Sequence, residues 1–156
     1  MEKKKEKKIC FICSSGGHLT ELFPIGKRLG RKYKHFWITF KNPMTENTLD
    51  GESYYLVQDP IRNPLIFLKL IAHSVFLFLR ERPNIVITTG AGMAVPFSII
   101  SKLFGRRLVF IESFCRTESP SLSGKMLYWF ADRFYVQWQQ NLRHFGSKAK
   151  YMGTIY

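Results

Sequence analysis

Two glycine-rich segments contain the residue types best suited to holding a phosphate. The first, SSGGH, comprises Ser14, Ser15, Gly16, Gly17 and His18 and lies between an apolar run and a helix-like pattern. Free N–H groups at the start of a helix suit an anion, and the imidazole of a histidine there can act as a general base near neutral pH. The alternative is structural: the glycines permit a tight turn, and the histidine caps or packs the helix.

The second segment is TTGAGMAVP, residues 88–96. Its Thr89, Gly90, Ala91 and Gly92 again follow an apolar run and precede a helix-like stretch. Neither segment matches G-x-G-x-x-G or the P-loop pattern, so the fingerprints of dinucleotide and ATP binding are absent. Turn geometry and close helix–sheet packing are the structural alternative here as well.

A third segment, residues 109–138, combines acids, bases and hydroxyls. Glu112 ends its apolar run, and Arg116, Glu118, Ser123 and Lys125 follow. An acid and several phosphate-binding donors on one loop are typical of a functional site. They are equally typical of a capped, solvated loop, so this segment alone does not decide between the two.

Patterns of metal ligands are missing from the sequence. There is no D-x-D, and the three aspartates, Asp50, Asp59 and Asp132, are scattered, which gives little support to a carboxylate site for Mg²⁺ or Mn²⁺. Zinc-type Cys/His spacings are also absent. Cys10 and Cys13 spell C-x-x-C within a predicted strand, where positions three apart face opposite sides. We therefore expect no metal, no cofactor and reduced thiols.

Short β-rich runs alternate with longer helical patterns along the chain. We expect strands at Lys8–Cys13, His35–Phe40, Ser53–Val57, Asn84–Thr88, Arg107–Ile111, Arg133–Val136 and Lys150–Met152, and helices at His18–Arg31, Pro64–Glu81, Ala91–Phe104, Ser121–Ala131 and Gln139–Phe145. This alternation predicts one α/β domain over residues 1–156, a doubly wound, Rossmann-like parallel sheet. Ligands bind such sheets at the carboxyl ends of the strands. Both glycine-rich segments should therefore flank one crevice.

The chain is strongly basic, with 24 Lys and Arg against 11 Asp and Glu, a formal net charge of +13. Such a surface attracts nucleic acid, anionic lipid or phosphorylated substrates. Nucleic-acid binding is disfavoured because no basic recognition helix is present. Residues 1–8, MEKKKEKK, form an expected basic tail that is solvated or touches anionic lipid. The six-residue apolar run after it is too short for a signal peptide.

Residues 63–82 predict an unusually apolar helix. A helix that is apolar nearly all round is either buried or in contact with a membrane. Its apolar part, 64–79, would be roughly 24 Å long, short of a hydrocarbon core of about 30 Å, so we do not expect it to span. The residues expected to contact the membrane surface are Leu65, Phe67, Leu68, Lys69, Phe76 and Arg80. The alternative is a core helix that contacts the sheet and a partner.

Four segments in order, SSGGHLTEL, TTGAGMAVP, the 109–138 block and the terminal YMGTIY, carry a family resemblance over nearly the whole chain. The sequence resembles the membrane-associated subunit of the two-part N-acetylglucosaminyltransferase of asparagine-linked glycosylation. It resembles that subunit's bacterial relatives in capsule and exopolysaccharide gene clusters at least as closely. The first glycine-rich segment, with its histidine, is also similar to that of the peptidoglycan lipid II-forming transferase.

The resemblance implies the N-terminal half of a GT-B glycosyltransferase divided into two chains. A separate partner would bind the nucleotide sugar, and residues 150–156 would dock on it. This chain would bind a polyprenyl-diphosphate-linked acceptor, peripherally, on the cytoplasmic face of the cell membrane. No cofactor is implied, because the donor is a UDP-sugar and an inverting GT-B enzyme needs no metal.

The resemblance also suggests roles for the residues singled out above. His18, or less favourably Glu112, would remove the proton of the attacking acceptor hydroxyl. Residues 14–17 would hold a phosphate of the acceptor or of UDP, residues 90–92 would line the opposite wall, and Arg116 and Lys125 would offset phosphate charge. The alternative function is a non-catalytic recruiter of a partner that contains the whole active site.

Overall fold

Seven strands form one parallel sheet in the computed structural model, which describes residues 5–60 and 63–155. The strands are β1 (Lys5–Ile12), β2 (Tyr33–Phe40), β3 (Tyr54–Val57), β4 (Ile85–Thr88), β5 (Arg107–Ile111), β6 (Arg133–Val136) and β7 (Ala149–Tyr151). Their order is β3-β2-β1-β4-β5-β6-β7. The order therefore reverses between β1 and β4, and the predicted doubly wound, Rossmann-like sheet is confirmed.

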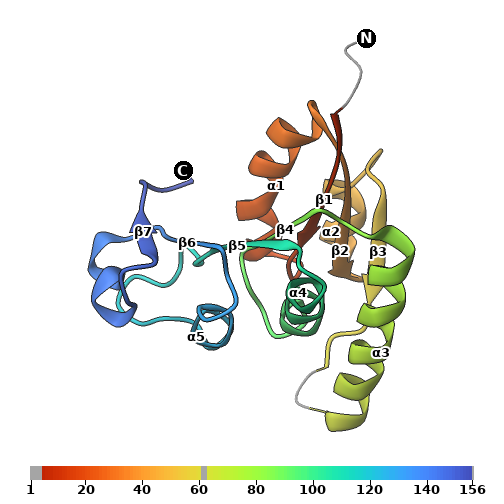
Figure 1. Ribbon diagram of the computed structural model, residues 1–156. Helices are drawn as coiled ribbons and strands as arrows, with labels where there is room; N and C mark the ends of the chain where they lie inside the picture. Colours follow the sequence, from red (N-terminus) through yellow and green to blue (C-terminus); the bar gives the residue numbers. More distant parts are fainter. Residues whose placement is uncertain (1–4, 61–62, 156) are drawn as a thin grey trace.

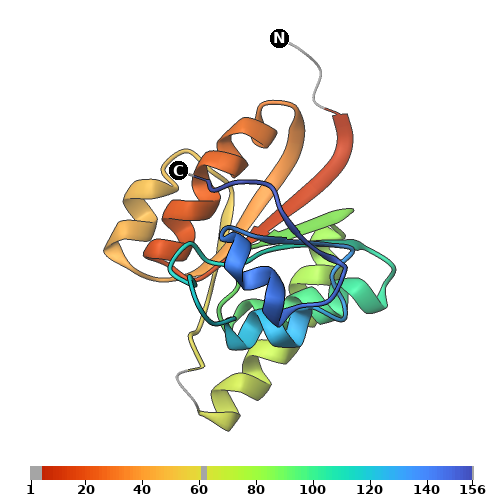
Figure 2. The ribbon, with the colours of Figure 1, turned by 90° about the vertical axis from the view of Figure 1, so that its left-hand side faces the viewer.

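Helices cover both faces of this sheet. They are α1 (Gly17–Gly30), α2 (Pro43–Thr48), α3 (Pro64–Glu81), α4 (Ala94–Leu103), α5 (Leu122–Leu127) and the 3-10 helix η1 (Gln139–His144). Helices α1 and α2 lie on one face, and α3, α4 and α5 lie on the other (Figure 1). Figure 2 shows the same layers from the side of β7, with the segment after β7 rising on the face that carries α1.

The core has one apolar layer on each face of the sheet. The layer beneath α3, α4 and α5 contains Phe36, Phe110 and Phe134. The layer beneath α1 and α2 contains Phe11 and Trp37. Neighbouring residues of one strand enter opposite layers because side chains alternate along a strand. Burial on both faces explains the continuous apolar runs of the strands.

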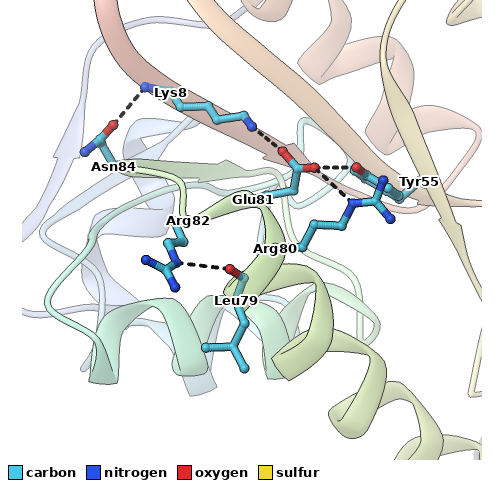
Figure 3. Close-up of polar contacts among 7 residues, drawn as sticks. All are labelled: Lys8, Tyr55, Leu79, Arg80, Glu81, Arg82 and Asn84. Carbon is cyan, nitrogen blue, oxygen red and sulfur yellow. Dashed lines mark hydrogen bonds and ion pairs between the residues drawn. The ribbon is translucent and has the colours of Figure 1, made fainter.

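A polar cluster fixes the C-terminal end of α3 to the sheet. Glu81, the last residue of α3, accepts hydrogen bonds from the Lys8 ammonium of β1 and the Tyr55 hydroxyl of β3 (Figure 3). The Arg80 guanidinium lies 3.8 Å from the same carboxylate. The side chain of Asn84 accepts a hydrogen bond from the backbone N–H of Lys8 at 2.9 Å. With this end held, the N-terminal half of α3 extends away from the sheet (Figure 1).

The predicted basic tail, residues 1–8, is shorter than expected. Residues 5–8 already belong to β1, where Lys8 is paired with Lys34 of β2. Pairing with the long neighbouring strand extends β1 through residues whose side chains are charged, because the ladder uses only backbone groups. Residues 1–4 lie outside the described residues.

Three further helical segments differ from the predictions. Helix α2 was not predicted, because six residues are too few to establish a period; it begins at the Asn42 side chain, which accepts from Met44 N–H at 2.9 Å. The helix expected at Ser121–Ala131 ends at Leu127. The helix expected at Gln139–Phe145 is a 3-10 helix.

Candidate functional site

A cavity of about 390 Å³ opens at the sheet edge where β1, β4 and β5 end. Its walls come from the turns after these three strands and from the start of α5. The lining residues are Gly17, His18, Glu21, Ala91, Gly92, Val95, Ser113, Cys115, Arg116, Ser121, Leu122, Ser123 and Met126. The three segments singled out in the sequence thus meet at one cavity, on the switch point between β1 and β4.

The turn between β1 and α1 contributes the first wall. Gly16 has φ 79° and ψ −137°, a backbone conformation essentially restricted to glycine. This conformation directs Gly17 and His18 into the cavity wall. Ser14 and Ser15 are half-buried in the turn and are not among the lining residues. Their predicted role in phosphate binding stays a prediction.

The turn between β4 and α4 contributes the facing wall. Gly90 has φ 102°, and a Cβ there would lie 2.7 Å from the Ser123 hydroxyl, so the turn packs directly against α5. Ala91 also has a positive φ, 77°. The Thr89 hydroxyl donates to the backbone carbonyl of His18 at 3.1 Å and so joins the two turns. Residues 91–93 form a turn before α4, which begins three residues later than predicted.

His18 is the imidazole of this cavity. Its Nδ1 is buried and has no hydrogen-bond partner of regular geometry among the described residues. Burial lowers the pKa of His18. The polar interaction with the Thr89 backbone and the negative charge of Glu112 oppose this shift, whereas the positive charge of Arg116 adds to it. The ring is therefore neutral at neutral pH and can accept a proton.

Glu112 lies behind the cavity wall. Its side chain is fully buried, and its two carboxylate oxygens accept backbone N–H groups of Ser113 and Ser121, each at 3.0 Å. A Cβ on Gly124 would collide with the same carboxylate. Through these contacts Glu112 anchors the loop between β5 and α5. Glu112 is not among the residues that line the cavity. Its predicted role as an alternative base therefore has less structural support than that of His18.

Glu21 is a lining residue that the sequence analysis missed. It is 3% exposed and accepts hydrogen bonds from the Ser113 hydroxyl at 2.9 Å, the Phe114 N–H at 3.2 Å and the Gln137 amide at 3.3 Å. Burial raises the pKa of Glu21, and these hydrogen bonds oppose the rise. The sequence signal was its position three residues after His18, on the same face of α1.

The remaining predicted residues divide into two groups. Arg116 and Ser123 line the cavity. Glu118 is exposed, and its backbone carbonyl is 2.6 Å from the His144 ring. Lys125 lines a different cavity, beneath η1, so the structure does not bring it together with the two turns. Among the described residues no group of three His, Cys, Asp or Glu side chains could hold a metal ion.

The residues predicted to contact a membrane lie on α3, and all four of their apolar side chains are exposed. The exposed fraction is 70% for Leu65, 63% for Leu68 and 56% for Phe76. Exposed side chains at 65, 68, 72, 75, 76 and 79 follow helical spacing and form one face. Lys69 and Arg80 are exposed beside this face. No helix among the described residues is both long and apolar enough to cross a bilayer.

The family of oligosaccharide biosynthesis proteins typified by Alg14 matches residues 54–155, well over half of the chain. The chain belongs to this Alg14-like family. It is 28% identical over 180 residues to the UDP-N-acetylglucosamine transferase subunit ALG14 of Homo sapiens, an alignment that covers 94% of this chain and 82% of the human protein. The subunit of the same name from Candida albicans is 27% identical over 181 residues, covering 97% of this chain and 82% of the relative.

Solved structures share the fold at low sequence identity. MurG of Acinetobacter baumannii has a TM-score of 0.79 at 16% identity, covering 96% of this chain and 46% of MurG. The UDP-GlcNAc 2-epimerase of Neisseria meningitidis, solved with UDP-GlcNAc, has a TM-score of 0.74 at 12% identity, covering 95% of this chain and 47% of the epimerase. The chain thus spans about half the length of these proteins. Its fold is that of the N-terminal half of GT-B enzymes such as MurG.

Proposed function

We propose that this Alg14-like chain is the acceptor-binding, membrane-associating subunit of a two-component, inverting UDP-sugar glycosyltransferase. A separate chain supplies the nucleotide-sugar site, and the acceptor is a saccharide on a polyprenyl diphosphate. The observation that carries the proposal is the convergence of His18 and both glycine-rich turns on one cavity. The names of its relatives, which are UDP-N-acetylglucosamine transferase subunits, support the reaction class.

The proposed transfer uses His18 as general base. The acceptor hydroxyl attacks the anomeric carbon of the UDP-sugar, and the new C–O bond forms as the bond to UDP breaks, with inversion. The hydroxyl proton passes to the neutral imidazole, and UDP leaves with the bonding electron pair. Support comes from the place of His18 in the lining of the cavity and from the lowered pKa of its ring.

Anionic groups of the substrates are held by the surrounding turns in this proposal. Backbone N–H groups at Gly17, the start of α1, suit a phosphate of the acceptor or of UDP. The Arg116 guanidinium at the same cavity offsets phosphate charge. Ala91 and Gly92 line the opposite wall.

Membrane association is proposed to occur through the exposed apolar face of α3. The helix lies in the bilayer interface, with Lys69 and Arg80 near anionic headgroups. The net charge of +13 adds attraction to an anionic surface. Attachment is peripheral and on the cytoplasmic face. Residues 150–156 dock on the partner chain; the last of them, Tyr156, lies outside the described residues.

The biosynthetic setting is part of the proposal. Capsule or exopolysaccharide synthesis was expected from the sequence resemblance, whereas the relatives named above are eukaryotic. The capsule or exopolysaccharide setting stays a prediction. Either setting would use the same chemistry, the transfer of a sugar to a lipid-linked saccharide.

The alternative function is a non-catalytic recruiter. The exposed face of α3 favours it, because membrane binding through α3 would bring a partner to its substrate without any use of the cavity. The test is a transfer assay on membranes that carry lipid-linked acceptor, with a panel of UDP-sugars. It compares this chain, its partner and both together. Activity of the pair alone supports the shared site, and equal activity of the partner alone supports the recruiter.

A further inference from the structure

A buried amide links the C-terminal segment to the cavity. Gln137 follows β6 directly and is 2% exposed. Its Oε1 accepts a hydrogen bond from the backbone N–H of Ile155 at 3.0 Å. Its Nε2 donates to the backbone carbonyl of Glu112 at 3.0 Å and to the Glu21 carboxylate at 3.3 Å. One side chain therefore connects the last described residue to a residue of the cavity wall.

The surroundings dictate which way this amide points. On one side it faces a carbonyl and a carboxylate, both of which only accept hydrogen bonds. On the other side it faces the N–H of Ile155, which only donates. The flipped amide would place its oxygen against Glu21 and the Glu112 carbonyl and its NH₂ against the Ile155 N–H. That arrangement would leave buried groups unsatisfied.

The carboxylate of Glu21 depends on its donors. It is buried in the first turns of α1, three residues after His18, and lines the same cavity. The Ser113 hydroxyl and the Phe114 N–H donate to Oε1, and Gln137 donates to Oε2. Gln137 is thus the donor that sets the position of the second oxygen.

The C-terminal segment 152–155 follows the last strand, β7, and lies outside the sheet ladder. It continues after β7 along the face that carries α1 and borders a second cavity of about 270 Å³ with Ile111 and Tyr135. Met152 in this segment is 77% exposed. The Ile155–Gln137 hydrogen bond is the contact that ties the end of this segment to the sheet edge.

We infer that Gln137 is a positioning residue, which transmits the seating of segment 152–155 to the Glu21 carboxylate in the cavity. The inference rests on the proposed function, in which that segment docks on the partner and the cavity binds the acceptor. When the segment is seated, the Ile155 N–H holds the amide and the amide holds Glu21. When the segment is displaced, the amide is free to turn and Glu21 loses a donor.

The link is tested first without any activity measurement. Carbon NMR of the chain labelled at its glutamate carboxyl groups follows the titration of Glu21, with Glu21→Gln as the assignment variant. Ile155→Pro removes the N–H that holds the amide, and Gln137→Met removes the amide. Both should move the Glu21 midpoint upward by about half a pH unit, because the ionised form loses a hydrogen bond. Met152→Ala, in the same segment, should leave the midpoint in place.

Two results of this titration would overturn the inference. If Gln137→Met moves the midpoint and Ile155→Pro does not, the segment does not act through the amide. If neither variant moves it, the amide does not stabilise Glu21. Ile155→Pro changes the backbone of the C-terminal segment, and Gln137→Met replaces a buried side chain that follows β6. Circular dichroism of both variants checks that the fold is retained.

The second arm uses the assembled transferase. Ile155→Pro should lower kcat about tenfold with little change in KM for the UDP-sugar, because a misplaced wall residue affects the transition state. Arg28→Ala, at an exposed position of α1 away from the cavity and the C-terminal segment, should retain the parent values. A kcat of the Ile155→Pro complex equal to that of the unmodified complex would contradict the inference. If the unmodified pair transfers no sugar, the proposed function fails, and the titration still decides whether the link exists.

Discussion

The hydroxyl of Thr89 donates a hydrogen bond to the backbone carbonyl of His18 at 3.1 Å. These residues are 71 positions apart and lie in the turns after β4 and β1, the two strands between which the sheet reverses its order. Thr89 is fully buried, so its hydroxyl has no water to bond to in place of this carbonyl. The first turn of α1 is therefore held against the facing turn, and the imidazole of His18 is fixed relative to the cavity.

The pH dependence of transfer should reflect the environment of His18. Burial lowers the pKa of this ring from its ordinary value of 6.5, so the neutral, proton-accepting form persists at lower pH. We expect the acid limb of kcat/KM for the assembled transferase to lie below pH 6.5. Rate measurements between about pH 5 and about pH 8 would check this. An acid limb above 6.5 would contradict a buried histidine base.

Gly90 should tolerate alanine less well than Gly105. Both have a positive φ, 102° and 72°, so alanine at either position should cost roughly 1–2 kcal/mol in backbone strain. Only Gly90 has a close neighbour, the Ser123 hydroxyl, 2.7 Å from the added Cβ, whereas nothing lies within 4 Å at Gly105. Urea unfolding should show a larger loss for Gly90→Ala. Equal losses would mean that the turn does not pack on α5 as described.

The face of α3 should determine binding to anionic vesicles. We expect the double variant Leu65→Gln/Leu68→Gln to lower the partition coefficient at least about tenfold, since each buried leucine contributes roughly 1.5–3 kcal/mol. Sedimentation with vesicles of phosphatidylglycerol and phosphatidylcholine measures this coefficient. Met152→Gln, equally exposed but on the C-terminal segment, is the matched control. Unchanged binding of the double variant would remove α3 from the membrane contact.

Acid should weaken the attachment of α3 to the sheet. Burial alone would raise the pKa of Glu81, but hydrogen bonds from Lys8 and Tyr55 outweigh it, and the pKa lies below its ordinary value of 4.5. A lowered folded-state pKa stabilises the fold above the unfolded value, and this stabilisation is lost as the pH falls through the folded value. Glu81→Gln should therefore unfold more easily at neutral pH, by roughly 2 kcal/mol, and differ little at about pH 3.

The control for this effect is Tyr55→Phe. It removes one hydrogen bond to Glu81 and keeps the Lys8 ion pair. Its loss of stability at neutral pH should be smaller than that of Glu81→Gln. Denaturant unfolding at both pH values gives the comparison. A gap between Glu81→Gln and the parent that does not narrow in acid would show that ionisation of Glu81 is not the cause.

Most of the sheet could be predicted because its strands are buried on both faces. Continuous apolar runs mark such strands, and glycine-rich turns mark their carboxyl ends, so the cavity edge was predictable from residues 14–18 and 88–92. Helix α2 was not predictable, since it depends on one capping side chain, that of Asn42. The start of β1 was also missed, because pairing with β2 outweighs the charges of residues 5–8.

The site was predictable only in part, because sequence does not show which polar side chains are shielded. Glu112 and Glu21 have the same chemistry, yet one anchors a loop and the other lines the cavity. Lys125 follows Ser123 by two residues, but on α5 that spacing turns its side chain toward a different cavity. These distinctions come from tertiary packing.

The most direct test of the proposed active site is transfer by the complex that contains His18→Ala. The complex should assemble, bind vesicles as the parent does, and transfer sugar at a rate lower by about 10²–10⁴, the usual contribution of a general base. Arg28→Ala, at an exposed position of the same helix, should retain full activity. Full turnover by the assembled His18→Ala complex would contradict the account and favour the recruiter.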